Sequence, residues 1–251
     1  MKAILLFLFL FNLFLLADEK PKGQEIIENL DKSLVLSDGL TRARLSIKKG
    51  NHETHFWKVN IFKKEEDVLY TFEVTHYKPV AKILSIKRGQ KIIYHNFLSG
   101  KFFQIEQMDK LERVLHTSFS YLDLSYSSYE TNYKPTDFDK SNIESTNSTT
   151  VRMTPFSQYS YQYIDLFVDN SYSPQKLDFT SKEGFLIKTM KLKYGKVKLK
   201  EQKSISEIST LKKIEMIDNN TSFISTLEFI EIDKDTNPDK ILYEMKTMYE
   251  K

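Results

Sequence analysis

Residues 55–74 read HFWKVNIFKKEEDVLYTFEV, a stretch that alternates apolar and polar side chains on both sides of a charged centre. In an extended chain, successive side chains point to opposite faces. Each half of the stretch therefore predicts a strand with one apolar and one polar face, and the charged residues between them predict a tight turn. The apolar positions are Trp57, Val59, Ile61, Tyr70, Phe72 and Val74.

The same alternation precedes this hairpin from Thr41, follows it to residue 105, and returns from about residue 148 to residue 233. Short polar turns join the segments, which favours antiparallel pairing with one buried face. In the second half, residues 185–194 and 196–202 are interpreted as separate strands. The sequence thus predicts a mainly β fold of about eleven antiparallel strands, arranged as a sandwich, a closed barrel or a strongly curved open sheet.

Two segments have a helical period instead. Residues 24–36 carry Ile26, Ile27, Leu30 and Leu34 as one apolar stripe, and a second stripe is predicted over residues 108–115. Residues 116–126 could hold another short helix. The polar segment 127–147 is interpreted as a long surface loop. The striped helices are suitable covers for a broad apolar sheet face.

The N-terminus predicts export. Lys2 precedes an apolar run that ends at Leu16, and Ala17 offers a small residue before Asp18. This is the layout of a signal peptide cleaved near Ala17, with an uncleaved anchor as the alternative. The chain contains no cysteine. An exported protein without disulfides is held by its apolar core, which favours a bacterial periplasm.

The net charge and the motifs of the sequence indicate neither nucleic-acid binding nor catalysis. The formal net charge is only +3 over 251 residues, and the lysines of residues 191–203 alternate with apolar residues, as on the solvated face of a hairpin. No phosphate-binding loop or nucleophile elbow occurs, and His52 and His55 would point to opposite faces of a strand. We therefore expect no catalytic residue, no metal site and no cofactor.

Aromatic residues are the remaining signal. The chain has 14 Tyr and 18 Phe, many of them at the apolar positions of the strands. Any one of them can be ordinary core. Together they indicate a wide apolar concavity beneath amphipathic helices, which is a natural container for hydrocarbon.

Several segments resemble the periplasmic outer-membrane lipoprotein-sorting proteins, LolA-like in the broad sense. The similarity follows their order along residues 24–251. The segments are FKKEEDVLYTFEV (62–74), ILSIKRGQKIIYHNF (83–97), TSFSYLDL (117–124), the strand-turn-strand unit 166–193 and NPDKILYE (237–244).

The resemblance implies an unclosed antiparallel β half-barrel with a helical lid, formed as a single domain by residues 18–251. It implies a monomeric carrier that takes lipoprotein acyl chains from an inner-membrane donor complex to an outer-membrane acceptor. A basic residue that steadies the lid in the family falls on Lys64 here, where lysine keeps the charge but lacks the planar guanidinium.

Strand parity and this resemblance give a hypothesis for the site, and one register error would reverse every facing assignment. The residues expected to bind lipid are Trp57, Val59, Tyr70, Phe72, Val74, Leu166, Val168, Met190 and Phe229. The residues expected in the lid are Met108, Leu111, Leu115 and Lys64.

Two alternatives remain open. A related carrier could move free lipids or glycolipids for an envelope exporter. In a different class, the same fold could serve as a sensor or scaffold that binds a partner protein. An enzyme is the least favoured reading.

Overall fold

The computed structural model describes residues 22–50, 52–74, 79–125, 128–139, 149–156 and 161–250. The expected signal peptide lies outside these residues. Within them, no helix is long and apolar enough to cross a membrane.

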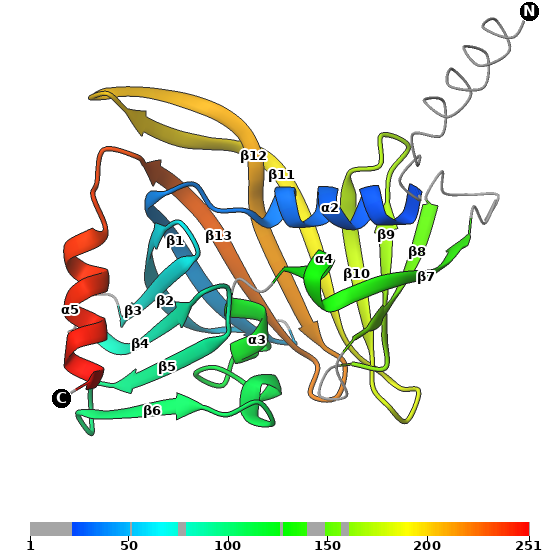
Figure 1. The fold of residues 1–251 in the computed structure, drawn as a ribbon, viewed down its shortest axis with the longest axis horizontal. Helices are drawn as coiled ribbons and strands as arrows, with labels where there is room; N and C mark the ends of the chain where they lie inside the picture. Colours follow the sequence, from blue (N-terminus) through cyan, green and yellow to red (C-terminus); the bar gives the residue numbers. More distant parts are fainter. Residues whose placement is uncertain are drawn as a thin grey trace, which may run out of the picture.

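One thirteen-stranded sheet forms the body of the molecule (Figure 1), in the order β6-β5-β4-β3-β2-β1-β13-β12-β11-β10-β9-β8-β7. Neighbouring strands pair antiparallel, apart from a short parallel contact between the far end of β11 and the end of β13. The strands are β1 (Gly39–Lys49), β2 (His52–Lys64), β3 (Asp67–Val74), β4 (Pro79–Ile86), β5 (Lys91–Asn96), β6 (Lys101–Ile105), β7 (Tyr133–Asp139), β8 (Thr149–Pro155), β9 (Tyr163–Val168), β10 (Pro174–Thr180), β11 (Leu186–Glu201), β12 (Ser204–Asp218) and β13 (Phe223–Asp233).

The sheet is open, because β6 and β7 are its two edges and do not pair with each other. Figure 1 shows it curving around one side, which we call the concave face. The predicted half-barrel architecture is confirmed, with thirteen strands in place of about eleven. Part of the difference is β7, which lies in the segment expected to be a loop and carries Pro135 at the sheet edge, where a missing N–H is tolerated.

Helices cover both faces of the sheet. On the concave face lie α2 (Lys22–Leu34), α3 (Tyr121–Leu124) and α4 (Tyr129–Asn132), and α5 (Asp239–Glu250) packs on the outer face of β2 and β3. The predicted N-terminal helix is confirmed as α2, displaced by two residues, and the short helix expected within 116–126 is confirmed as α3. The sequence analysis did not predict α5.

Two apolar cores follow from this arrangement. The larger lies between the concave face and α2, where Ile26, Ile27 and Leu30 are at most 1% exposed. A smaller one joins Leu242 and Met245 of α5 to the outer side of β3–β5. Successive side chains of β3, β4 and β5 therefore belong to different cores, so these strands are more continuously apolar than strands of a sheet that is buried on one face.

The helix predicted over residues 108–115 is wrong. Only one 3₁₀ turn, η1 (Asp109–Leu111), forms there. Leu115 and His116 have φ angles of 49° and 61°, which end any right-handed helix. The backbone turns back instead, and Val114 N–H donates to the carbonyl of Phe119 at 2.9 Å. A helix over these eight residues would have too few hydrogen-bonded turns to be more stable than this local backbone pairing.

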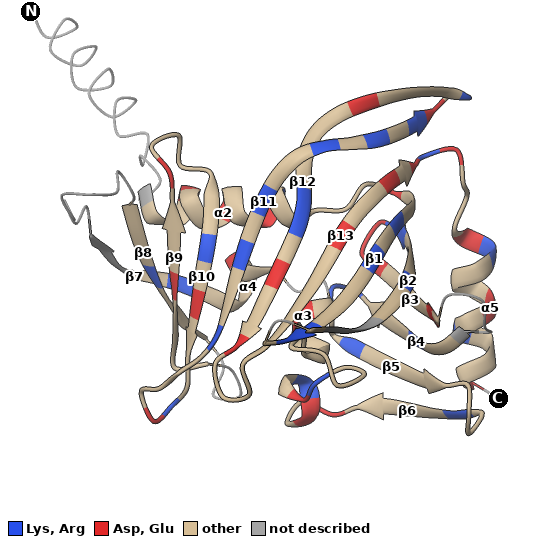
Figure 2. Ribbon diagram, turned by 180° about the vertical axis from the view of Figure 1, so that it is seen from behind, with Lys and Arg blue, Asp and Glu red and all other residues tan. Residues whose placement is uncertain are grey.

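Two further expectations need correction. The segment 127–147 contains α4 and β7, and its residues 127 and 140–147 lie outside the described part of the chain. The strands expected at 185–194 and 196–202 are one strand of 16 residues, β11, which passes Gly195 without a turn and pairs with β12 along its length. Seen from behind, β11 and β12 carry basic and acidic residues interspersed (Figure 2). Nζ of Lys196 in β11 lies 3.5 Å from Oε2 of Glu207 in β12.

Candidate functional site: an apolar cavity under the helices

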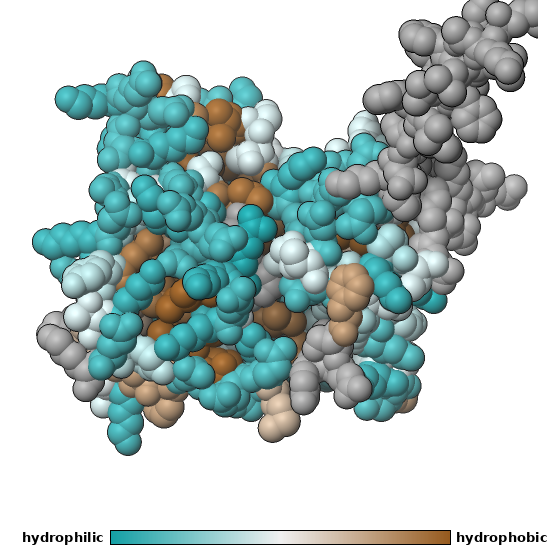
Figure 3. Space-filling view, in the orientation of Figure 1, coloured by the Kyte–Doolittle hydropathy of each residue, from teal (hydrophilic) through white to brown (hydrophobic). Residues whose placement is uncertain are grey.

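A cavity of about 130 Å³ lies between the concave face and its helices. The sheet supplies an apolar floor from widely separated strands. Its lining includes Ile61, Tyr70, Phe179, Met190, Leu227 and Phe229. In the view of Figure 3, apolar surface gathers in the middle of the molecule within a mainly hydrophilic exterior. The cavity can therefore accept hydrocarbon. Its lining also includes polar and charged side chains, which are Asp31, Arg88, Gln107, Lys110, Asp123, Ser128 and Asn132.

The end of α2 forms part of the roof. The helix presents its apolar stripe to the sheet, and Leu34 then continues that stripe to the cavity, followed by Val35 and Leu36 in the link to β1. At the start of α2, a Cβ on Gly23 would lie 2.9 Å from Cβ of Pro135 in β7. This glycine lets the helix approach the sheet edge closely.

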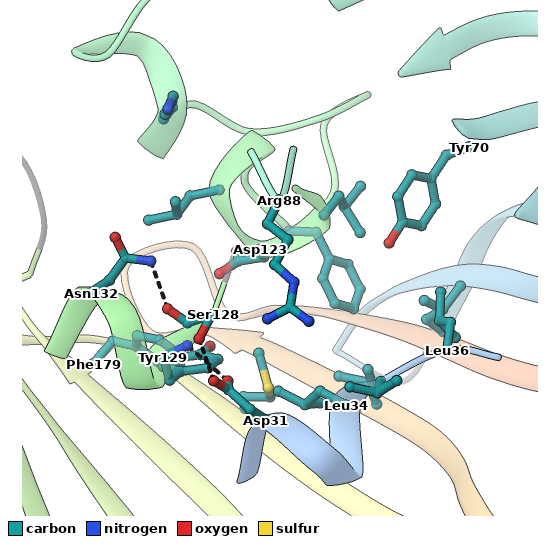
Figure 4. Close-up of a pocket in the computed structure, with 18 of the residues that line it drawn as sticks. Asp31, Leu34, Leu36, Tyr70, Arg88, Asp123, Ser128, Tyr129, Asn132 and Phe179 are labelled. Carbon is teal, nitrogen blue, oxygen red and sulfur yellow. Dashed lines mark hydrogen bonds between the residues drawn. The ribbon is translucent and has the colours of Figure 1, made fainter. Parts of the chain in front are cut away.

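Helix α4 is tied to α2 by one carboxylate. Asp31 accepts hydrogen bonds from the backbone N–H of Tyr129 at 2.7 Å and of Glu130 at 3.0 Å, and from the Ser128 hydroxyl (Figure 4). Ser128 also accepts from Thr131 N–H, as an N-cap does. Asp31 thus satisfies backbone donors at the start of α4 and links the two roof helices through the edge of the cavity.

Helix α3 is fixed by a second carboxylate that lines the cavity. Asp123 and Ser120 form a reciprocal capping box. Lys188 of β11 donates to Asp123 at 2.5 Å, and its ammonium lies 4.9 Å and 4.7 Å from the ring centres of Tyr161 and Phe179. Burial raises the pKa of Tyr161 well above its usual value, and the nearby Asp123 carboxylate adds to the effect.

Two basic side chains lie at the rim of the cavity. Arg88, in the turn between β4 and β5, extends its guanidinium into the space shown in Figure 4. The ammonium of Lys110, in η1, donates to the carbonyl of Gly89 at 2.8 Å. Because Gly89 follows Arg88 in the chain, this bond keeps the two segments that carry the basic side chains close together. Burial lowers the pKa of Lys110. We call Arg88 and Lys110 the cationic rim.

The structure places the nine residues expected to bind lipid on the concave face. Three of them, Tyr70, Met190 and Phe229, line the cavity. Four others do not line it and are at most 1% exposed within the same core; these are Val59, Phe72, Leu166 and Val168. Trp57 and Val74 pair with each other across β2 and β3 and are partly buried. A binding role for all nine stays a prediction.

The four residues expected in the lid do not form one. Met108 is 76% exposed and Leu111 is 36% exposed, whereas Leu115 packs on the main core. Lys64 points to the outer face, where its ammonium lies 3.9 Å from Asp239 of α5. Side chains three positions apart on a strand point to opposite faces. Lys64 is three positions from Ile61, which lines the cavity, so it points away from the cavity. The roof is made instead by α2, α3 and α4.

Sequence reasoning missed the rim and the ties between the helices. The sequence analysis gave neither Asp31 nor Arg88 a role. One available signal was Ser128, a residue type preferred at helix N-caps, with acidic Glu130 in the turn that follows. Among the residues in the described ranges, no three His, Asp or Glu side chains are grouped so that they could hold a metal ion.

The model of a protein family with the description "Uncharacterized protein" matches residues 93–249. The chain belongs to this family. The match begins in β5 and ends in α5, so it includes α3, α4 and strands β6 to β13 but not α2. No curated protein sequence matches the chain.

Solved structures share the fold. A LolA superfamily protein from Nitrosomonas europaea superposes with a TM-score of 0.66 at 18% identity, covering 88% of this chain and 96% of that one. A domain named for outer membrane lipoprotein sorting, from Vibrio parahaemolyticus, gives 0.64 at 16% identity, covering 83% and 90%. A DUF1329 family protein from Desulfovibrio piger gives 0.63 at 13%, covering 82% and 89%. The resemblance drawn from the sequence is confirmed at the level of the fold, which is LolA-like.

Proposed function

We propose that the chain is a periplasmic carrier that binds the acyl chains of lipoproteins and moves them towards the outer membrane. In this proposal residues 18–251, released by cleavage near Ala17, act as one monomeric domain without catalytic activity. The cargo comes from a donor complex in the inner membrane and passes to an acceptor in the outer membrane. The observation that carries the proposal is the apolar cavity between the sheet and its roof.

The size of the cavity indicates that the roof must move. Its volume of about 130 Å³ is close to that of an engineered cavity of about 150 Å³ that binds benzene. A long acyl chain is several times larger than benzene. The described conformation therefore corresponds to a closed carrier, and loading requires α2 and α4 to move away from the sheet.

The energetics suit a reversible carrier. Each methylene transferred from water to an apolar site contributes about 0.8 kcal/mol. Separating the roof from the sheet exposes apolar surface of Leu34 and its neighbours and offsets part of that gain. Binding is then favourable but not irreversible, so an acceptor can withdraw the cargo.

A carrier of free lipids for an envelope exporter is the second candidate. The cationic rim favours it, since Arg88 and Lys110 stand where the headgroup of a lipid with its chain in the cavity would lie. The acyl attachments of a lipoprotein are uncharged amides and esters, which make no use of two cations.

Native mass spectrometry of the chain from Asp18 onward, with and without a triacylated lipopeptide, tests the proposal. We expect a one-to-one adduct. Leu34→Asp puts a carboxylate at the cavity and should abolish the adduct, because its charge would be desolvated by the acyl chain. Lys32→Asp, on the exposed side of the same helix, should retain it. A wild-type mass that never shifts would overturn the carrier and favour a partner-binding scaffold.

A further inference from the structure

The charged groups of the cavity fall into two sets. The carboxylates have partners, since Asp31 accepts three hydrogen bonds from Ser128 and the start of α4, and Asp123 is paired with Lys188 and Ser120. A bound lipid would have to break these contacts to reach them. They are therefore structural, and the deep part of the cavity offers an apolar environment.

The outer polar groups are basic. Arg88 and Lys110 both line the cavity, from the β4–β5 turn and from η1, and the bond from Lys110 to Gly89 brings these two segments together. Glu66, in the turn between β2 and β3, lies near Arg88: its Oε1 is 3.7 Å from Nε of Arg88, and its side chain is 60% exposed. An exposed ion pair at this distance is weak.

We propose that the cationic rim binds the anionic headgroup of a lipid whose acyl chain occupies the cavity. The proposal rests on the carrier function proposed above and deepens its second candidate, because it takes the cargo to be a free amphiphile with a carboxylate or phosphate head. Arginine donates through a planar fork that fits either group, and lysine adds a point charge beside it. Partial burial strengthens both interactions relative to water, because the effective dielectric at the rim is lower.

Three probes with the same chain separate the possibilities. Palmitate supplies a carboxylate, 1-palmitoyl-lysophosphatidylglycerol supplies a phosphate, and monopalmitoylglycerol is uncharged. Dissociation constants are measured by calorimetry below the micelle concentration of each probe. We expect wild-type protein to bind at least one anionic probe about tenfold more tightly than the uncharged one. Comparison of palmitate with the lysophospholipid identifies the headgroup class.

Variants locate the effect. Arg88→Gln with Lys110→Gln should reduce the anionic preference to about twofold or less while leaving monopalmitoylglycerol binding unchanged. Lys87→Gln is the matched control, because it removes a charge from the same turn at an exposed position that does not line the cavity. Raising the salt concentration should weaken anionic binding to wild type more than to the double variant.

The outcomes distinguish this inference from the proposed function. If wild type binds all three probes equally, or if the double variant keeps the preference, the cationic rim is not a headgroup site and the carrier proposal stands. If wild type binds neither the probes nor the lipopeptide, the carrier proposal itself fails. The wild-type comparison is decisive even if the double variant does not fold.

Discussion

Lys188 and Asp123 form an ion pair of 2.5 Å although their side chains are only 9% and 3% exposed. Lys188 lies on β11 and Asp123 in the first turn of α3, 65 residues earlier in the chain. The pair thus joins the roof to the sheet beside the cavity. Two charges removed from water in this way stabilise the fold only while both are present.

Lys188→Met should therefore destabilise the protein strongly, by about 3–5 kcal/mol, because Asp123 would be left buried without a counter-ion. Urea unfolding followed by circular dichroism measures the free energy of unfolding. Lys196→Met is the control, since its pair with Glu207 is mostly exposed and should contribute less than about 1 kcal/mol. Equal effects of the two substitutions would show that the buried pair has no special role.

Asp31→Ala should loosen the roof without unfolding the sheet. The substitution removes the acceptor that holds the N–H groups of Tyr129 and Glu130, at a cost of about 1–2 kcal/mol for a cap of this kind. Those two amides should exchange hydrogen faster, and lipid should bind faster because the closed state is less favoured. Glu25→Ala, at an exposed position of α2, should change neither rate. Slower lipid association in Asp31→Ala would contradict this account of the roof.

Gly39→Ala should be destabilising for a reason of geometry. Gly39 has a φ of +119°, and a Cβ there would lie 2.4 Å from the carbonyl oxygen of Asp233 in the adjacent strand. The β1–β13 pairing at the centre of the sheet would have to shift. Gly50→Ala also has a positive φ, but its Cβ would meet no atom of the described residues within 4 Å. It should cost only about 1–2 kcal/mol, and a thermal shift no larger for Gly39→Ala would refute the steric argument.

Stability should fall at alkaline pH. Burial raises the pKa of Tyr121 to about 12, with smaller contributions from Tyr94 and Glu112. A raised pKa means that the folded state holds the proton more tightly, so stability is intact below about pH 10 and is lost as the pH rises towards 12. Unfolding midpoints measured across this range should fall less steeply in Tyr121→Phe. Tyr243→Phe, at an exposed position, should keep the wild-type slope; equal slopes in all three proteins would refute the assignment.

Much of the fold could be predicted from the sequence because strand alternation is a local property. The alternation of Trp57, Val59 and Ile61 identifies a strand and a face without any knowledge of its neighbours. The same rule failed where local periodicity competed with backbone pairing, as in residues 108–115, where Val114 pairs with Phe119. Strand alternation also did not predict that α5 covers the outer face of β2 and β3.

The sequence by itself determined the class of this protein: an antiparallel sheet with an apolar face and an amphipathic N-terminal helix that could cover it. Only the tertiary structure decided which side chains border a cavity. Phe72 and Phe229 both lie at apolar positions of their strands and both belong to the main core, yet only Phe229 lines the cavity. The rim at Arg88 and the tie from Asp31 to Tyr129 likewise depend on contacts between distant segments. Alternation fixes the face to which a side chain points, whereas the curvature of the sheet and the docking of the helices decide what it meets there.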